Sequence, residues 1–198
     1  MPHENQRGDD CGMLMVNHGM RMCSDEACYC ERSEPMMELK ARMPNGEFEP
    51  AALLGDQQYY GTSDLHPTVA FTKGLPLKGI CVDLYRHAGK GRDSRFRGTT
   101  PFLMVNADLG QGAICWAGLG GWVYELDNIP GWNVEKLLDG KVPTVNGFTG
   151  APFPGEMEGA IDSRIPPEMI RRAGQVIKLR RFLTVSEWTT NKKCPSLA

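Results

Sequence analysis

The segment from Pro152 to Met169 holds two glutamates, Glu156 and Glu158, between a Pro-Gly turn and a Pro-Pro turn. If the residues between the turns form a β-strand, alternate side chains share one face, and both carboxylates point the same way. Two neighbouring carboxylates can form a catalytic pair. The same spacing is also typical of a solvent-exposed strand face, so the pair alone leaves both interpretations open.

The elements that would position this pair are short. Turn residues and hydrophobic spacing predict helices over residues 66–74, 81–91 and 133–140 and a further helix within 106–121; in the first, Ser63 or Asp64 is the cap and Gly74 the stop. Alternating and β-branched residues predict strands over 57–63, 99–105, 122–127, 156–161 and 175–183. Short strands with small helices between them indicate a mixed α+β fold.

The chain divides by composition into an arm and a domain. Residues 1–50 are rich in methionine and cysteine and lack a hydrophobic period, so we expect an irregular arm. Residues 51–198 are expected to form the catalytic domain, and the arm is expected to be dispensable for its activity. Residues 1–56 contain 11 acids and 5 bases, whereas residues 160–198 contain 3 acids and 8 bases.

The basic end suggests phosphate binding as one interpretation. Its eight cations could meet a nucleotide or a nucleic acid, or could protect a solvent-exposed strand edge; they are Arg164, Arg171, Arg172, Lys178, Arg180, Arg181, Lys192 and Lys193.

No apolar run has the length of about 20 residues that a membrane helix needs, so we expect no membrane partner. The first residues lack the order of a secretory signal, and we expect action in a cytosol, either where the chain is made or after delivery into a target cell.

The cysteines give a weaker indication. The chain has 7 of them, an odd number that argues against a complete disulfide framework. Cys23, Cys28 and Cys30 follow His18 and could ligate zinc, although the spacing is not that of Cys-x2-Cys knuckles. We therefore expect free thiols in the arm and no metal site.

Several blocks, in order, resemble the ADP-ribosyltransferase toxins, in the broad class of cholera toxin and the heat-labile enterotoxin A subunit. "DLYRHA" is similar to a helix-end block of those toxins, and "WVYELDNIPGWNVEKLLDG" to their strand, loop and following helix. "PFPGEMEGAIDSRIPPEMI" resembles their Glu-x-Glu strand with the turn that follows. The resemblance covers Tyr59 to about Phe182, and it implies a fold of short strands and small helices around an NAD cleft.

The resemblance implies Glu158 as the catalytic glutamate and Glu156 as its companion. Cleaving the bond between nicotinamide and ribose builds positive charge on the sugar, which a fixed carboxylate stabilises. Glu158 would hold the ribose 2'-hydroxyl, and Glu156 would orient or deprotonate the acceptor.

The remaining site residues follow from the same resemblance. The family's Ser-Thr-Ser strand corresponds to Gly98-Thr99-Thr100, whose two hydroxyls could support Glu158 or merely fill a strand. Tyr60 stands where the family has Arg or His, followed by Gly61 and Thr62, which match a polymerase-like NAD motif. Tyrosine cannot replace arginine as a phosphate partner, so Arg97 or Arg95 is expected to supply that charge.

The sequence therefore predicts a mono-ADP-ribosyltransferase toxin or effector domain. Its substrate would be NAD, its acceptor a protein or a nucleic acid, and NAD glycohydrolase its side activity; the oligomeric state is left open. The alternative is a non-catalytic module that binds NAD or nucleic acid on a degenerate transferase fold.

Overall fold

The computed structural model describes residues 40–55, 57–89, 93–104, 112–127, 129–139, 155 and 157–195. The chain divides into two units, residues 1–32 and 33–198, and every described residue belongs to the second. The strands are β1 (Lys40–Arg42), β2 (Phe48–Pro50), β3 (Ala52–Leu53), β4 (Gln58–Thr62), β5 (Phe96–Thr99), β6 (Trp122–Leu126), β7 (Pro130–Asn133), β8 (Gly159–Asp162), β9 (Ile170–Leu179), β10 (Phe182–Val185) and β11 (Thr189–Thr190). The helices are α1 (Pro67–Lys73), α2 (Leu84–Ala88), α3 (Ala113–Ala117), α4 (Val134–Leu138) and the short 3-10 helix η3 (Pro167–Met169).

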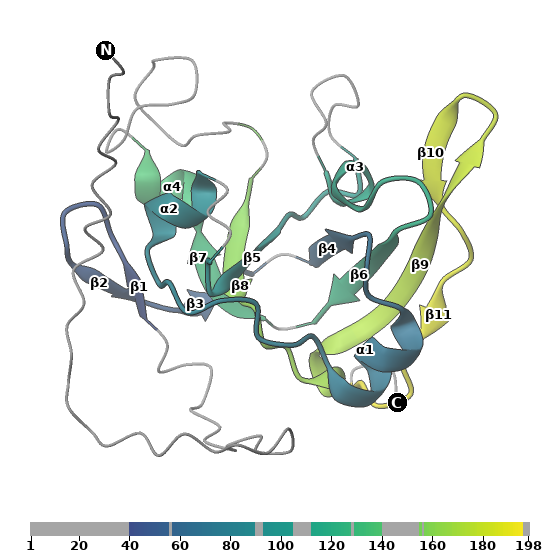
Figure 1. The fold of residues 1–198 in the computed structure, drawn as a ribbon, viewed down its shortest axis with the longest axis horizontal. Helices are drawn as coiled ribbons and strands as arrows, with labels where there is room; N and C mark the ends of the chain where they lie inside the picture. Colours follow the sequence, from purple (N-terminus) through teal and green to yellow (C-terminus); the bar gives the residue numbers. More distant parts are fainter. Residues whose placement is uncertain are drawn as a thin grey trace, which may run out of the picture. The chain divides into compact units, whose positions relative to one another are not determined.

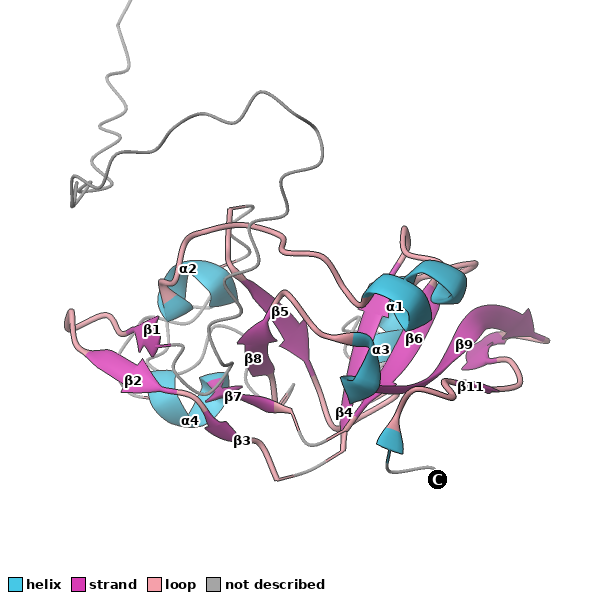
Figure 2. Cartoon of the chain, turned by 90° about the horizontal axis from the view of Figure 1, so that it is seen from below, coloured by secondary structure: helices cyan, strands magenta, loops and turns pink. Residues whose placement is uncertain are grey.

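Two antiparallel sheets carry the candidate site (Figures 1 and 2). The first has the strand order β10-β9-β6-β4, with β11 also paired to β9, and the second has the order β3-β7-β8-β5. Tyr59 of β4 and Thr100, directly after β5, link the two sheets through reciprocal backbone hydrogen bonds of 2.8 and 3.1 Å. The end of β5 is thereby fixed beside β4.

Alternation along β6 explains how the first sheet is covered on both faces. Tyr124 and Leu126 are buried in a cluster with Ala70 of α1, whereas Val123 packs with α3. Glu125 is also buried, and its carboxylate accepts a hydrogen bond from Arg172, its cross-strand partner in β9, at 2.6 Å. Because successive side chains of a strand point to opposite faces, β6 contributes apolar side chains to one core on each face of the sheet.

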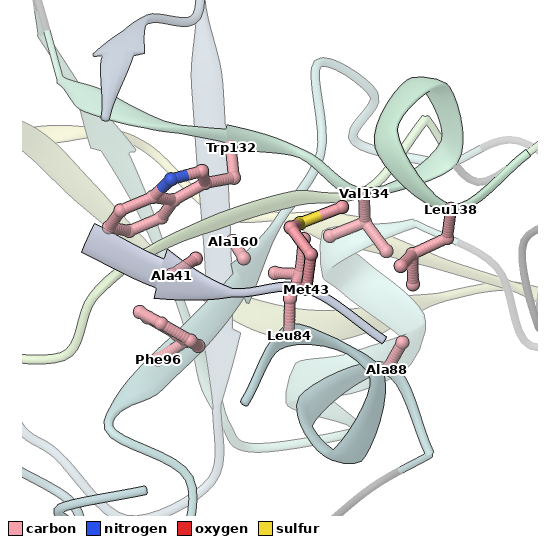
Figure 3. Close-up of a cluster of buried hydrophobic side chains, with 9 residues drawn as sticks. All are labelled: Ala41, Met43, Leu84, Ala88, Phe96, Trp132, Val134, Leu138 and Ala160. Carbon is pink, nitrogen blue, oxygen red and sulfur yellow. The ribbon is translucent and has the colours of Figure 1, made fainter. Parts of the chain in front are cut away.

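A third core lies between α2, α4, β5, β7, β8 and the β1–β2 hairpin (Figure 3). Ala41 and Met43 lie in this core with Phe96 and Trp132, and the Trp132 indole donates a 2.8 Å hydrogen bond to the Glu49 carbonyl. Residues 40–50, which the sequence assigned to the arm, thus pack as part of the compact unit.

The mixed α+β fold expected from the sequence is confirmed, and most elements fall near their predicted positions. α1 ends at Gly74 as predicted, but its N-cap is His66, whose Nδ1 accepts from the Thr68 amide, rather than Ser63 or Asp64. The predicted strand over 99–105 was wrong, since β5 ends at Thr99. The single strand expected over 175–183 is part of two strands, β9 and β10, joined by a turn at residues 180–181.

Candidate active site

Glu158 lies immediately before β8 rather than inside a strand. The preceding residue, Met157, has a φ of 47°, in the left-handed region that non-glycine residues rarely adopt. The strand expected over 156–161 therefore begins only at Gly159, and strand alternation does not set the direction of the Glu158 side chain. Glu156 itself lies outside the described residues.

The Glu158 carboxylate occupies the space that a side chain at position 98 would fill. A Cβ built on Gly98 would come within 2.6 Å of the Glu158 Oε1 atom. Gly98 is the residue that the resemblance aligns with the first serine of the Ser-Thr-Ser strand. Here, the absence of a side chain at position 98 makes room for the carboxylate.

His87 of α2 is the titratable neighbour of Glu158. Its Nε2 lies 3.3 Å from Glu158 Oε1, an ion-pair distance without hydrogen-bond geometry, and the two side chains are 8% and 16% exposed. On the other side of the ring, Nδ1 lies 2.9 Å from the Ser94 hydroxyl, which also accepts from the Phe96 amide. If the Ser94 hydroxyl donates to Nδ1, the imidazole proton is on Nε2 and faces the carboxylate.

Hydrogen bonds fix the backbone at Glu158 and at Gly159. The Glu158 carbonyl accepts a hydrogen bond from the Val134 amide at 2.9 Å. Thr99, which was predicted to support Glu158, donates from its hydroxyl to the Gly159 carbonyl at 3.0 Å and to Gln58 at 2.8 Å. Thr99 therefore holds the backbone next to Glu158, while the Thr100 hydroxyl accepts from the Phe102 amide.

Tyr60 and Arg97, both predicted to bind NAD, contact each other. Arg97 Nη1 donates to the Tyr60 hydroxyl at 2.6 Å, and the guanidinium carbon lies 5.0 Å from the centre of the Tyr60 ring. The same guanidinium donates to the carbonyls of Ser163 and Pro76, at 2.8 and 2.7 Å. Arg97 is only 9% exposed, and its three hydrogen bonds hold the guanidinium in one position.

Tyr60, Gly61, Thr62 and Arg97 line one cavity of about 520 Å³, together with Lys78 and Trp116 among others. Arg97 and Gly98 are consecutive in β5, so their side-chain directions point to opposite faces of the strand. The cavity and the Glu158 carboxylate are thus on opposite faces of β5, and Glu158 is not among the residues that line the cavity.

Gly61 and Thr62 have structural partners in this region. A Cβ on Gly61 would lie 2.1 Å from the Ala113 carbonyl oxygen of α3, so the glycine permits close packing of the helix on β4. The Thr62 hydroxyl donates to Asp64 at 2.7 Å. This bond, followed in importance by one from the Ser63 hydroxyl, lowers the pKa of the Asp64 carboxyl.

Arg95, the second arginine considered for the missing charge, pairs with the buried Asp162 at 3.2 Å. Its Nε is buried and has no hydrogen-bond partner among the residues that the structure describes. In the described part of the chain, no three His, Cys, Asp or Glu side chains are grouped so as to hold a metal ion. The proposed zinc ligands His18, Cys23, Cys28 and Cys30 lie outside that part.

Comparisons with known proteins give a match at the level of structure. A variant of the Scabin toxin from Streptomyces scabies has a TM-score of 0.50 and 21% sequence identity, covering 70% of this chain and 76% of Scabin. A guanine-specific ADP-ribosyltransferase has a TM-score of 0.50 and 18% identity, covering 73% of this chain and 81% of that enzyme. The chain has the ADP-ribosyltransferase toxin fold.

Comparisons of the sequence gave no match. No family model matches the chain, and no curated protein matches it. Scabin and the guanine-specific enzyme have each also been solved with NADH, in structures with TM-scores of 0.48 to this chain. The finer resemblance to the cholera toxin class stays a prediction.

Sequence reasoning missed His87 as the neighbour of Glu158. The residue lies within the "DLYRHA" block, which we used only to establish the resemblance. Nothing local marks His87 as a partner of Glu158, because the two are 71 positions apart and meet only once α2 and β8 pack beside β5. A histidine inside a block that already resembles a family was the available signal.

Proposed function

We propose that the chain is an NAD-dependent mono-ADP-ribosyltransferase domain of a toxin or effector, with Glu158 as the carboxylate at the reacting sugar. The observation that carries the proposal is the position of this carboxylate, against Gly98 and beside His87 in the ADP-ribosyltransferase toxin fold. The fold alone does not establish activity.

The residues around Glu158 suit this reaction. The carboxylate is 16% exposed, so a substrate can reach it while most of its surroundings are protein. A negative charge held there stabilises positive charge that develops on ribose as nicotinamide leaves, and it acts more strongly than in water. The His87 ring lies 3.3 Å from the carboxylate and limits the directions it can take.

We assign the acceptor step to the region of Glu156, as the resemblance implies. A carboxylate there would orient or deprotonate the acceptor nucleophile. Where no acceptor is bound, water can take its place, which gives NAD glycohydrolase activity. The acceptor is a macromolecule, and the guanine-specific neighbour makes guanine-containing nucleic acid the first class to test.

We assign the residues that line the cavity no role in the proposed reaction. Arg97 and Lys78 would suit the diphosphate of NAD in charge. Yet Arg97 already donates to Tyr60, Ser163 and Pro76, and the cavity lies on the other face of β5 from Glu158. We propose that Tyr60 and Arg97 stabilise the fold that positions β5.

Nicotinamide release from NAD by the full chain tests the proposal. Glu158→Gln, which keeps size and removes charge, is expected to lower the rate by about a hundredfold or more. Glu168→Gln is the matched control, because Glu168 is exposed on η3, and its rate should equal that of the unmodified chain. Equal rates for both variants contradict the assignment. Labelled NAD added to lysate, with protein and nucleic-acid fractions counted separately, then identifies the acceptor class.

A second candidate function is a non-catalytic NAD-binding or nucleic-acid-binding module. The specific observation in its favour is that β4, which holds Tyr60 and Gly61 where the resemblance implies an NAD motif, contains no cationic residue. Calorimetry that detects NAD binding to a chain that releases no nicotinamide would support this module over the enzyme.

A further inference from the structure

The β9–β10 hairpin ends in an exposed apolar surface that the proposed transferase activity does not use. Figures 1 and 2 both show the hairpin extending away from β6 and β4. Phe182, Leu179 and Ile177 are 73%, 62% and 38% exposed. A group of neighbouring large apolar side chains with this much exposure is unusual on the surface of a soluble protein.

The three apolar side chains lie on one face of the hairpin. Phe182 is the direct cross-strand partner of Leu179, and Ile177 is two residues before Leu179 on the same strand. The opposite face carries Val176 and Leu183, which pack with α3 in the core cluster. The hairpin therefore has one face against the protein and one apolar face that no described residue covers.

Three cations lie at the tip of the hairpin: Arg180 and Arg181 form the turn, and Lys178 lies on the face of β9 opposite Ile177 and Leu179. Lys178, Arg180 and Arg181 are all exposed, and none forms an ion pair with a described residue. The segment 170–186 contains no acidic residue. Arg171 and Arg172, by contrast, both form ion pairs with Glu125.

The turn itself favours a functional interpretation of these arginines. Arg180 has a φ of 56°, a conformation for which a two-residue hairpin turn normally uses glycine or asparagine. Arginine at this position costs stability, and Arg180 forms no hydrogen bond or ion pair with a described residue.

We propose that the hairpin tip, defined as residues 177–182, docks on an anionic lipid membrane. An anionic bilayer surface attracts the three cations, and the boundary between headgroups and acyl chains accepts Phe182 and Leu179. Single-stranded nucleic acid fits less well, because two aliphatic side chains beside one aromatic ring give bases little to stack on. No helix in the described ranges is long and apolar enough to cross a membrane, and surface docking needs none.

Sedimentation of the full chain with vesicles tests the proposal. Vesicles of phosphatidylcholine with phosphatidylserine should bind the chain, and vesicles of phosphatidylcholine alone should not. Removing the three cations as Lys178→Gln, Arg180→Gln and Arg181→Gln together should weaken partitioning by about a hundredfold, or roughly fivefold for each charge. Leu179→Ser with Phe182→Ser should also abolish binding while leaving the charge unchanged.

A matched control removes the same charge elsewhere. Lys40, Lys73 and Lys192 are exposed and lie on other elements, and their joint replacement by Gln should leave most vesicle binding intact. Unchanged melting temperatures will show that the variants are folded. Equal losses in the control and the hairpin variants, or no binding to anionic vesicles, overturn the proposal. Hairpin-dependent binding to single-stranded DNA without vesicle binding overturns it in favour of nucleic acid.

A probe at the tip separates insertion from adsorption. Phe182→Trp places an indole on the exposed face, and anionic vesicles should shift its emission to shorter wavelength, after subtraction of the native tryptophan signal. Brominated lipids should quench the added signal. Vesicle binding without shift or quenching contradicts burial of the apolar face, and none of these readouts depends on NAD.

Discussion

The Nε2 atom of His87 lies 3.3 Å from Oε1 of Glu158, and the Ser94 hydroxyl lies 2.9 Å from the other ring nitrogen. His87→Gln should lower nicotinamide release by roughly tenfold, because one orienting contact on the carboxylate is lost. Ser94→Ala should act in the same direction through the ring. A rate unchanged in His87→Gln, at an unchanged melting temperature, would show that the contact does not serve the reaction.

Gly98 and Gly61 should respond differently to added side chains. Gly98→Ala meets only the end of a flexible side chain, Glu158 Oε1 at 2.6 Å, so the carboxylate moves and the fold survives. Activity should fall by about a hundredfold with little change in melting temperature. Gly61→Val meets the Ala113 backbone at 2.1 Å and should cost about 2–3 kcal/mol of unfolding free energy. Denaturant titration and nicotinamide release separate the two effects.

Tyr60→Phe should act on stability. The substitution removes the acceptor of the Arg97 Nη1 hydrogen bond and leaves a buried charged donor unsatisfied. A loss of about 1.5–3 kcal/mol of unfolding free energy is expected for a bond to a charged group. The affinity for NAD, measured by titration well below the melting temperature, should stay the same. A large loss of affinity without loss of stability would return Tyr60 to the NAD site.

Truncation should locate the start of the folded unit. A chain starting at residue 40 keeps the β1–β2 hairpin, whereas one starting at residue 51 loses Ala41, Met43 and the carbonyl bonded to Trp132. The shorter chain should lose about 3–5 kcal/mol of unfolding free energy, as for a buried methionine deleted with its surroundings. Equal urea midpoints for the two chains would contradict the packing of the hairpin.

Thr62→Val should raise the pKa of Asp64. The Thr62 hydroxyl is the main cause of a pKa below the ordinary 3.8, and NMR titration of the carboxyl measures the change directly. Because the folded pKa is depressed, the stabilisation is present above about pH 4 and is lost as pH falls through the folded value. The stability difference between the two chains should therefore shrink in acid. A difference that grows on acidification would contradict the assignment.

Local chemistry made part of the fold predictable. α1 was found from Pro67 in its first turn and Gly74 at its end, and β6 from the alternation of apolar residues. The strand expected from Thr99 was misplaced because Pro101, which lacks an amide N–H, stands where a ladder bond would be needed. The turn at Arg180 carried no glycine or asparagine, and so it gave no signal.

The candidate site was predictable in composition but not in arrangement. Glu158 was identified from its motif, but its contact with His87 depends on packing between segments 71 positions apart. Arg97 and Thr99 were named from their motif, and the structure gives their side chains partners in Tyr60 and Gln58. Such long-range partners are set by the tertiary fold, which local propensity does not encode.

The left-handed backbone of Met157 places the stability of the folded protein in opposition to the rate of the proposed reaction. Glycine there would relieve the strain and make the folded protein harder to unfold, by up to about 1 kcal/mol. It would also give the peptide before Glu158 more freedom, so that the carboxylate would spend less time against Gly98. Selection for a long-lived protein and selection for a fast one would thus favour different residues at position 157.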